Sequence, residues 1–227
     1  TLFPRVMSHT VAANVAAVLG VRGRLLAPCV ACASSAQAIG AGYETVRDGY
    51  QDVMICGGAE EVHPSTAAVF DVVYAASRNY NDRPSRTPRP FDRDRDGLVV
   101  SEGAAAVVLE EREHARTRGA PIHGEVLGYA TCCDVSHMTQ PNAEGMLHCM
   151  RAAVQAAGLS PGELDYINAH ATGTEIGDRA EAAATRELVG EAVPLSSTKG
   201  HTGHTLAACG AMEAIFCLLM MRDGFLA

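Results

Sequence analysis

The sequence predicts an α/β fold in which helices cover central sheets. Two short apolar runs, 53–56 and 104–109, have the length and composition of strands that are buried on both faces. Segments with apolar residues at helical spacing lie between such runs, and this alternation is typical of layered α/β proteins. Glycine and alanine are abundant and Trp is absent, which favours close packing of backbones over packing of large rings.

The expected elements alternate along the whole chain. In the first part we expect, in order, a helix at 8–19 that ends at Gly20, a strand at 24–30, a helix at 32–47, a strand at 53–56, a helix at 66–76 and a strand at 104–109. In the second part we expect a charged helical turn at 111–118, a strand at 123–131, a helix at 146–157, a strand at 165–169, a helix at 179–189 and a buried apolar helix at 206–221. The stretch 79–97, rich in Arg, Asp and Pro, has the composition of a loop or linker.

Charge, hydropathy and cysteine usage exclude several classes of protein. The net charge of −8 gives the chain no general basic surface for nucleic acid. The longest apolar run, 206–221, is too short and too polar for a membrane span. Eight cysteines in a long chain with a regular apolar pattern favour free thiols in a reducing, cytoplasmic setting. Because the chain starts at Thr1 without a start methionine, we expect an internal piece of a longer protein.

The first segment with the marks of chemistry is V-A-C-A-S-S-A-Q-A-I-G, residues 30–40. It places Cys32 at a predicted strand-to-helix junction among small residues. A helix N-terminus favours thiolate over thiol and offers a backbone N–H to a developing oxyanion. Taken alone, a buried structural cysteine is the more frequent outcome. Cys29 and Cys32 also form a single CxxC, but neither a second pair of zinc ligands nor a thioredoxin-like frame accompanies it.

The second segment is Y-I-N-A-H-A-T-G-T-E-I-G-D-R-A-E, residues 166–181. His170 follows a predicted strand, where the functional groups of open α/β sheets gather. Thr172 and Thr174 alternate beyond it and can donate hydroxyl hydrogen bonds. Asp178 and Glu181 have the spacing of a helix capping box, which leaves either carboxylate open to a second role.

The third segment is L-S-S-T-K-G-H-T-G-H, residues 195–204. It contains Lys199, the only lysine of the chain, followed by His201 and His204. The two histidines suggest metal ligands, yet no cysteine or carboxylate lies at matching helical spacing, so no metal site is predicted.

Together these segments resemble the β-ketoacyl synthases of the thiolase superfamily, in particular the cysteine–histidine–histidine kind. The nucleophile segment matches at Cys32, the motif N-A-H-x-T-x-T at His170, and the motif S-T-K-x-x-T-G-H at Lys199 and His204. Further matches cover 52–60, 89–104 and 133–141, and all six are collinear. Departures from the family pattern occur at Ser101, Ala171 and Gly200-His201.

The resemblance implies a thiolase-like, five-layer αβαβα fold built from two related halves. Residues 1–120 would form the later part of the N-terminal half, which carries the nucleophile. Residues 121–227 would form most of the C-terminal half, which carries both histidines. The fold would be incomplete at both ends, without the opening strands and the C-terminal glycine-rich loop with its gating phenylalanine. The polar stretch 79–97 would be ordered in place of a mobile linker.

The resemblance also implies an acyltransferase that performs decarboxylative Claisen condensation in fatty-acid or polyketide elongation. Cys32 would carry the acyl group, and His170 and His204 would stabilise the enolate formed when a malonyl thioester loses carbon dioxide. No metal or redox cofactor is implied, because the phosphopantetheine arm arrives on an acyl carrier protein. The other implied partner is a second ketosynthase-like subunit, identical or different.

The family pattern assigns supporting roles to further residues. The ionic network around the histidines would consist of Lys199, Asp178 and Glu181. The groups that hold the pantetheine arm would be Thr172 and Thr174. The same pocket would be lined by His137 and Thr139.

Three alternatives are set against this interpretation. A chain-length factor shares the fold but lacks the nucleophile, which is present here as Cys32. A thiolase or a third-type synthase would have Cys or Asn in place of His204. A purely structural or dimerisation piece of a larger synthase is the alternative from another class. The variants at 170–174 and 199–204 look more like polyketide or aryl-polyene ketosynthases than fatty-acid ones.

Overall fold

The computed structural model describes residues 7–137 and 139–227. The chain folds into two compact units, each assembled from stretches that are distant in the sequence. The first unit contains the described residues before 61 together with 102–125 and 205–222. The second contains 61–101, the described residues of 126–204, and 223–227. The predicted boundary at residue 120 separates two related halves of the family fold, which are defined differently from these two units. That boundary stays a prediction.

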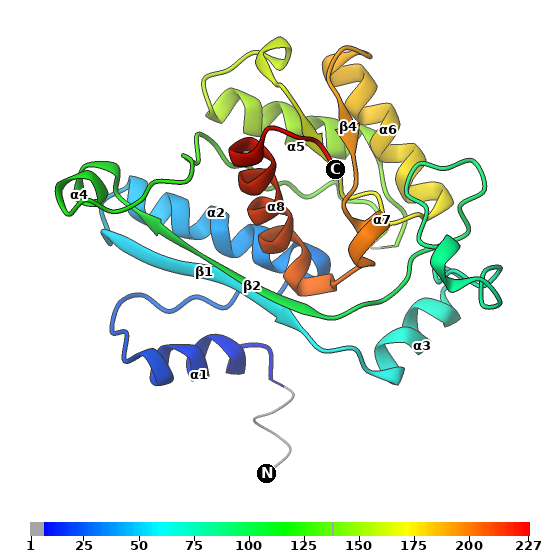
Figure 1. The fold of residues 1–227 in the computed structure, drawn as a ribbon, viewed down its shortest axis with the longest axis horizontal. Helices are drawn as coiled ribbons and strands as arrows, with labels where there is room; N and C mark the ends of the chain where they lie inside the picture. The colour runs from blue at the N-terminus through cyan, green and yellow to red at the C-terminus, as the bar shows by residue number, and fades with distance from the viewer. Residues whose placement is uncertain (1–6, 138) are drawn as a thin grey trace. The chain divides into compact units, whose positions relative to one another are not determined.

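The first unit is built on an antiparallel pair of strands (Figure 1). Strand β1 spans Val53–Glu60 and β2 spans Gly103–Glu110, with Cys56 opposite Val107. Helix α2, Ser34–Arg47, packs on β1 and follows the short 3-10 turn η2, Ala31–Ala33. The remaining elements of this unit are α1 (Thr10–Leu19), α4 (Arg112–Thr117), η5 (Leu206–Ala208) and α8 (Cys209–Asp223).

Small residues let the elements of the first unit approach closely. A Cβ atom on Gly42 of α2 would lie 2.2 Å from the Cys56 sulfur, and one on Gly58 of β1 would lie 2.5 Å from the Ala207 carbonyl oxygen. A Cβ on Gly210 would meet Ala36 at 2.8 Å. These distances are shorter than contact distances between packed atoms, so the glycines are required by packing. This explains the abundance of small residues in the sequence.

Three strand predictions in the first unit are wrong in whole or in part. The run 104–109 lies within β2, but it is not buried on both faces, since Val108 is 61% exposed. Strand β1 is longer than 53–56, runs through both glycines at 57 and 58, and is covered on one face, since Val53 and Ile55 are each 42% exposed. The stretch 24–30 forms no ladder among the described residues; the Arg24 N–H instead bonds to the Gln51 side chain. Apolar composition gave the strand signal, but a strand also needs a neighbouring backbone to pair with.

The second unit combines helices with one short parallel pair of strands. Strands β3 (Ile167–Asn168) and β4 (Leu195–Ser196) pair in parallel, and helices α5 (Ala143–Ala156) and α6 (Glu175–Val189) pack on each other. The other elements are α3 (Pro64–Val72), η3 (Pro84–Arg86), η4 (Pro161–Glu163) and α7 (Lys199–Thr202). The predicted strand at 123–131 is absent from the described ladders; beyond residue 126 it runs along α5.

The polar stretch 79–97 is ordered, so its composition-based interpretation as a linker is wrong. The Asp96 carboxylate accepts hydrogen bonds from the Ser77 hydroxyl and from the N–H groups of Arg78 and Asn79. Arg89 pairs with Asp92 at 2.9 Å. Arginines and aspartates in this loop therefore help to hold its shape, because the carboxylates of Asp92 and Asp96 each accept from more than one donor.

Within residues 7–137 and 139–227, every helix is too short or too polar to cross a bilayer. The apolar helix expected at 206–221 is divided between η5 and α8, and its buried side chains include Leu206, Cys209 and Met220. Its apolar face is thus used in packing within the first unit.

Replacing Gly58 with Ala should destabilise the first unit. The added Cβ would sit 2.5 Å from the Ala207 oxygen and 2.9 Å from the Ser35 Cβ, and overpacking of this kind costs about 1–3 kcal/mol. The measurement is the free energy of unfolding in urea. Gly162→Ala is the matched control, because a Cβ there meets nothing within 4 Å. Equal stability of both variants would contradict the proposed packing constraint.

Candidate active site

Two histidines from separate segments meet in the second unit. His170 follows β3, and His204 follows β4 and the short helix α7. Because β3 and β4 are parallel, their carboxyl ends lie at one edge of the sheet. The His170 and His204 rings contact edge to face, with centroids 5.1 Å apart and an interplanar angle of 85°.

The backbone around each histidine is fixed by hydrogen bonds to other loops. The His204 N–H donates to the Val99 carbonyl at 2.8 Å, and its carbonyl accepts from the Ser101 N–H at 3.0 Å. The Ser197 hydroxyl donates to the Ala171 carbonyl at 2.7 Å, which ties the two histidine loops together. The ring positions therefore follow from the fold of the backbone.

His204 is neutral at physiological pH. Its side chain is buried, with the residue 2% exposed, and burial together with the nearby Lys199 charge lowers its pKa to about 3. The pKa of His170 is also lowered well below its usual value, first by loss of hydration and then by the charges of Lys199 and His204. His170 is partly accessible to solvent, whereas His204 is buried. A neutral imidazole has one N–H donor and one acceptor nitrogen.

Glu181 of α6 holds the loop that carries His170. Its two carboxylate oxygens accept the backbone N–H groups of His170 and Ala171, each at 2.7 Å. The side chain is buried, and desolvation raises its pKa while these two hydrogen bonds and the Lys199 charge act in the opposite direction. The carboxylate is thus a structural brace for the backbone of the loop that carries His170.

Asp178, one turn earlier in α6, joins the polar stretch to the same loop. Its carboxylate accepts from the Phe91 N–H at 2.7 Å and from the Gly173 N–H at 3.1 Å. The Arg95 guanidinium lies 3.6 Å from it, and burial raises the Asp178 pKa. The predicted capping box is wrong, because α6 begins at Glu175 and both carboxylates lie inside the helix.

The two threonines after His170 lie together. The Thr172 and Thr174 hydroxyl oxygens are 3.1 Å apart. Gly173 between them has φ +89°, and a Cβ there would come within 2.9 Å of the Gly97 oxygen. Since Gly97 also donates its N–H to the Gly173 carbonyl at 3.0 Å, this position requires glycine for both its conformation and its close approach.

Phe91, Arg95 and Gly97 had no individual role in the sequence analysis, although the stretch that contains them matches the family. These residues support the threonine loop through the backbone N–H of Phe91, the guanidinium of Arg95 and the backbone of Gly97. Phe91 also has a positive φ of 62°, which is uncommon for a residue with a side chain. The high content of Arg and Asp in this stretch is the sequence feature that could have indicated such a supporting role.

His137 and Thr139 contact each other in the described structure. The His137 Nδ1 lies 3.0 Å from the Thr139 hydroxyl, and both side chains are exposed. Their place in a substrate pocket stays a prediction. His201, the other histidine of the third segment, is exposed on α7 whereas His204 is buried, so these two rings lie in different surroundings.

Cys32 lies in the first unit, in η2 directly before α2. The turn is fixed by Ser34, whose hydroxyl donates to the Ala31 carbonyl at 2.7 Å and accepts from the Val30 N–H at 2.9 Å. The Cys209 thiol lies 3.3 Å from the Cys32 carbonyl oxygen. Ala31 has a φ of 46°, a conformation that costs energy for alanine and persists where the surroundings enforce it. The half-buried thiol thus sits at the start of a helix, as predicted from the motif.

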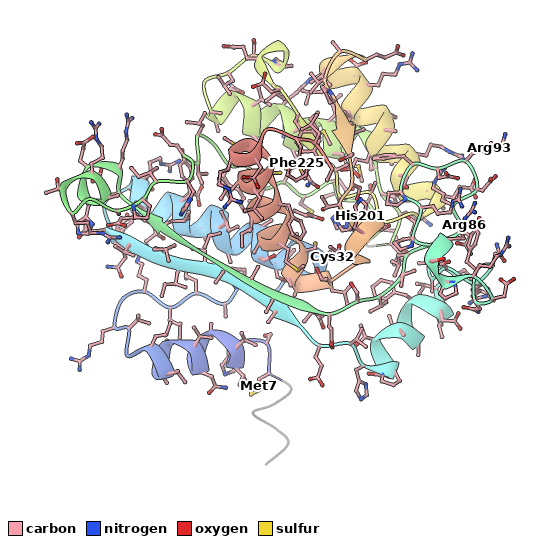
Figure 2. All side chains as sticks on the ribbon, viewed as in Figure 1. Met7, Cys32, Arg86, Arg93, His201 and Phe225 are labelled. Atoms are coloured by element: carbon pink, nitrogen blue, oxygen red, sulfur yellow. The ribbon has the colours of Figure 1, made fainter. Side chains whose placement is uncertain are left out.

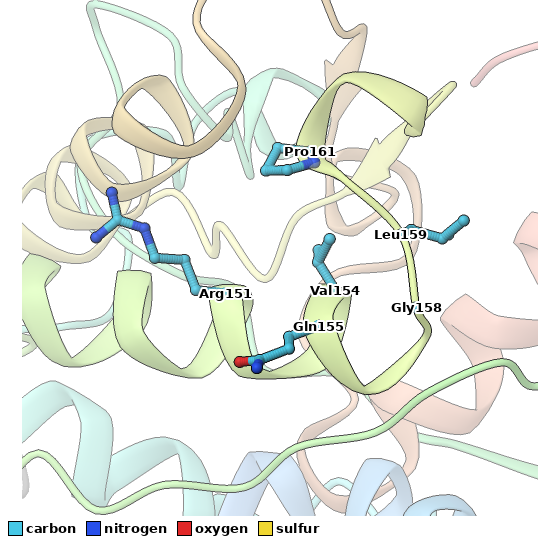
Figure 3. A pocket seen from close by; sticks show the side chains of 6 residues that line it. All are labelled: Arg151, Val154, Gln155, Gly158, Leu159 and Pro161. Atoms are coloured by element: carbon cyan, nitrogen blue, oxygen red, sulfur yellow. The ribbon is translucent and has the colours of Figure 1, made fainter.

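A separate shallow hollow lies at the end of α5 (Figure 3). None of the predicted site residues lines it. Arg151 at its rim pairs with Glu187 at 3.3 Å. Its lining consists of Arg151, Val154, Gln155, Gly158, Leu159 and Pro161.

Comparisons with known proteins agree on one family. The family model described as "Beta-ketoacyl synthase, N-terminal domain" matches residues 2–115, and the one described as "Beta-ketoacyl synthase, C-terminal domain" matches 123–227. The 3-oxoacyl-[acyl-carrier-protein] synthase 1 of Haemophilus influenzae is 42% identical over 229 residues, which cover 99% of this chain and 56% of that protein.

Two solved structures are also similar. The crystal structure of a β-ketoacyl synthase from Burkholderia phymatum is 50% identical with a TM-score of 0.93, over 95% of this chain and 52% of that one. A type II PKS acyl-carrier protein in complex with its ketosynthase bound to the hexaketide matches at 32% identity and a TM-score of 0.93, over 97% and 55%. These likenesses confirm the thiolase-like α/β fold class. The chain spans about half the length of the relatives that it matches.

Acid should destabilise the second unit through His204. Between its folded pKa of about 3 and the ordinary value of 6.5, the unfolded chain binds a proton that the folded protein excludes. The free energy of unfolding should therefore fall as the pH drops below about 6.5, by on the order of 1 kcal/mol per pH unit from this ring. Urea unfolding between about pH 7 and pH 5 measures the slope.

His204→Asn should reduce that slope by the contribution of one group. His201→Asn is the matched control, because its exposed ring loses little hydration on folding. A slope that His204→Asn leaves unchanged would contradict the neutral, buried state of His204.

Proposed function

Since the chain belongs to the β-ketoacyl synthase family, we propose that it carries the catalytic residues of an enzyme that condenses an acyl group with a malonyl thioester. The product is a 3-ketoacyl thioester on a carrier protein. The observation that carries the proposal is the edge-to-face contact of His170 and His204, whose ring centroids lie 5.1 Å apart. Two such rings can direct N–H groups to a single oxygen, which is the requirement for stabilising an enolate.

The first half-reaction loads the enzyme. The Cys32 thiolate attacks the carbonyl carbon of an acyl thioester, and the bond from that carbon to the carrier sulfur breaks. The carrier leaves as a thiol with the proton that the Cys32 thiol gave up. The start of α2 directly after Cys32 favours the thiolate and the tetrahedral oxyanion through the positive end of the helix dipole.

The second half-reaction forms the carbon–carbon bond. The malonyl carboxylate leaves as carbon dioxide, and the electrons of the broken bond become an enolate whose oxygen accepts hydrogen bonds from His170 and His204. The carbon of the enolate then attacks the acyl carbonyl, and the bond to the Cys32 sulfur breaks. Neither half-reaction is a redox step, and the histidines supply the charge stabilisation, so we propose no metal or redox cofactor.

The loop after His170 would receive the pantetheine arm. Thr172 and Thr174 present two adjacent hydroxyl groups, and Lys199, Asp178 and Glu181 hold the loops and the electrostatic balance around the rings. His137 and Thr139 would line the same pocket. A cytoplasmic setting remains a proposal that rests on cysteine usage.

The proposed partners are an acyl carrier protein and a second ketosynthase-like subunit, identical or different. The carrier protein is supported by the similar ketosynthase that was solved in complex with one. The relatives include a 3-oxoacyl-[acyl-carrier-protein] synthase and a type II PKS ketosynthase, so both fatty-acid and polyketide elongation fit the proposal.

Separating the half-reactions tests the proposed roles. In the complete enzyme, His204→Ala should lower carbon dioxide release from malonyl carrier protein by at least about 100-fold, the usual loss for one oxyanion donor. Acyl transfer to Cys32, followed by mass spectrometry, should persist. Cys32→Gln should have the opposite effect: no condensation, but continued or enhanced decarboxylation.

Cys29→Ser is the matched control, because this exposed thiol lies three residues from Cys32 and outside the proposed chemistry. It should leave both half-reactions intact. Full decarboxylation by His204→Ala would demote His204 to a structural residue and remove the main support for the proposal.

The arginines of the polar stretch are the proposed docking site for the acidic carrier protein. Arg78 pairs with Asp71 at 2.8 Å and Arg89 with Asp92 at 2.9 Å, so these two have a structural use. Arg86 is exposed (Figure 2), and the pair of Arg83 with Asp82 lies in solvent, where such pairs contribute little. Arg83 and Arg86 are therefore the better candidates for docking.

Reversing the charge at Arg83 and Arg86 should raise the KM for the carrier protein on the order of tenfold at low salt and weaken its salt dependence. The kcat should change little, since neither residue belongs to the histidine cluster. The double variant Arg22→Glu with Arg112→Glu, at exposed positions of the first unit, is the charge-matched control. An unchanged KM in the double variant would contradict docking at this site.

A further inference from the structure

Residues 128–134 run antiparallel along helix α5 in the second unit. A Cβ on Gly128 would lie 2.8 Å from the Ala153 oxygen, near the end of the helix. The Cys149 thiol lies 3.6 Å from the Ala130 oxygen, one turn earlier. A Cβ on Gly145 would meet the Asp134 Cβ at 2.3 Å, in the first turn. As the residue number rises along the segment, the number of the contacted α5 residue falls, so the two run antiparallel.

The register places Cys132 between the contacts of Ala130 and Asp134. In an extended segment alternate residues face the same side, so Cys132 faces α5 with the even-numbered residues, and Cys133 faces away. The Cys132 and Cys149 thiols lie within hydrogen-bonding reach of each other. Cys132 is exposed and Cys149 is half-buried under the segment.

We propose that Cys132 and Cys149 form a reversible disulfide when the protein meets a peroxide. The exposed Cys132 reacts first: its sulfur attacks one peroxide oxygen, the O–O bond breaks, and a sulfenic acid and one water form. The Cys149 sulfur then attacks the Cys132 sulfur, and the hydroxyl leaves with the Cys149 proton as a second water. Two thiols are oxidised, one peroxide is reduced, and a dithiol reductant reverses the bond.

The surroundings of the two thiols support this order. Burial, followed by the contact with Cys132, raises the pKa of Cys149 to about 11, so Cys149 is a thiol at neutral pH and a poor first target for peroxide. Cys149 lies beside Cys132, where it can attack the oxidised Cys132 sulfur as the resolving thiol. Neither cysteine belongs to the histidine cluster or to the Cys32 turn, so this dithiol is independent of the proposed condensation.

The bond would fasten the start of the loop that carries His137 and Thr139. Residues 132–142 connect the extended segment to α5, which begins at Ala143. A link from Cys132 to the middle of that helix closes this loop covalently.

The test treats the protein with one equivalent of hydrogen peroxide, blocks the remaining thiols and digests it with a protease that cleaves after glutamate. Cleavage at Glu125, Glu144 and Glu163 separates a peptide with Cys132 and Cys133 from one with Cys149. The expected result is a disulfide-linked pair of these peptides, with a mass two hydrogen atoms below the sum of the two. Reduction with dithiothreitol should separate them. Cys133→Ser should keep the pair, and both Cys132→Ser and Cys149→Ser should lose it.

Three results would overturn the proposal. They are a disulfide between Cys132 and Cys133 within one peptide, a pair that survives Cys132→Ser through Cys133, and oxidation of Cys132 to a sulfinic acid with no pair. Circular dichroism of each variant excludes loss of the fold as the cause of a missing pair. The decarboxylation assay is a separate readout, so failure here leaves the proposed condensation untouched.

Discussion

The histidine cluster depends on two carboxylates buried in one helix. Glu181 accepts the N–H groups of His170 and Ala171, and Asp178 accepts those of Phe91 and Gly173. Buried backbone donors without a partner would cost about 1–3 kcal/mol each. Four donors from two loops are therefore satisfied from α6, and the helix sets where these loops, and hence the His170 ring, can lie. The desolvation of these carboxylates is offset by the donors that surround them.

A buried cation completes the electrostatics of the cluster. Lys199 is 1% exposed. Its positive charge disfavours protonation of the His170 and His204 rings, and it favours the ionised form of the Glu181 carboxylate. One residue thus promotes neutral rings and a charged brace. Removal of one partner from such a buried set leaves another charge uncompensated, so the members behave as a unit rather than as separate contributions.

The first unit obeys a different constraint, which is the close approach of backbones. Gly42 and Gly58 leave room for the Cys56 side chain and for the Ala207 carbonyl. The Ser35 hydroxyl accepts the Ala211 N–H at 3.0 Å across the same contact. Small residues on both sides of β1 thereby position the α2 start, where Cys32 lies. Steric fit holds the nucleophile, whereas hydrogen bonds to carboxylates hold the histidines.

The sequence by itself determined the order of most helices, the helix end marked by Gly20, and the candidate residues Cys32, His170 and His204, because local periodicity and motif spacing depend on neighbouring residues. Only the tertiary structure decided that His170 and His204 meet and that Asp178 and Glu181 are braces inside α6. It also decided that 24–30 and 123–131 lack ladders and that β1 has an open face. Strand pairing and hydrogen bonds such as that from Phe91 to Asp178 join residues that are far apart along the chain. A local sequence pattern contains no information about which distant residues the fold brings together.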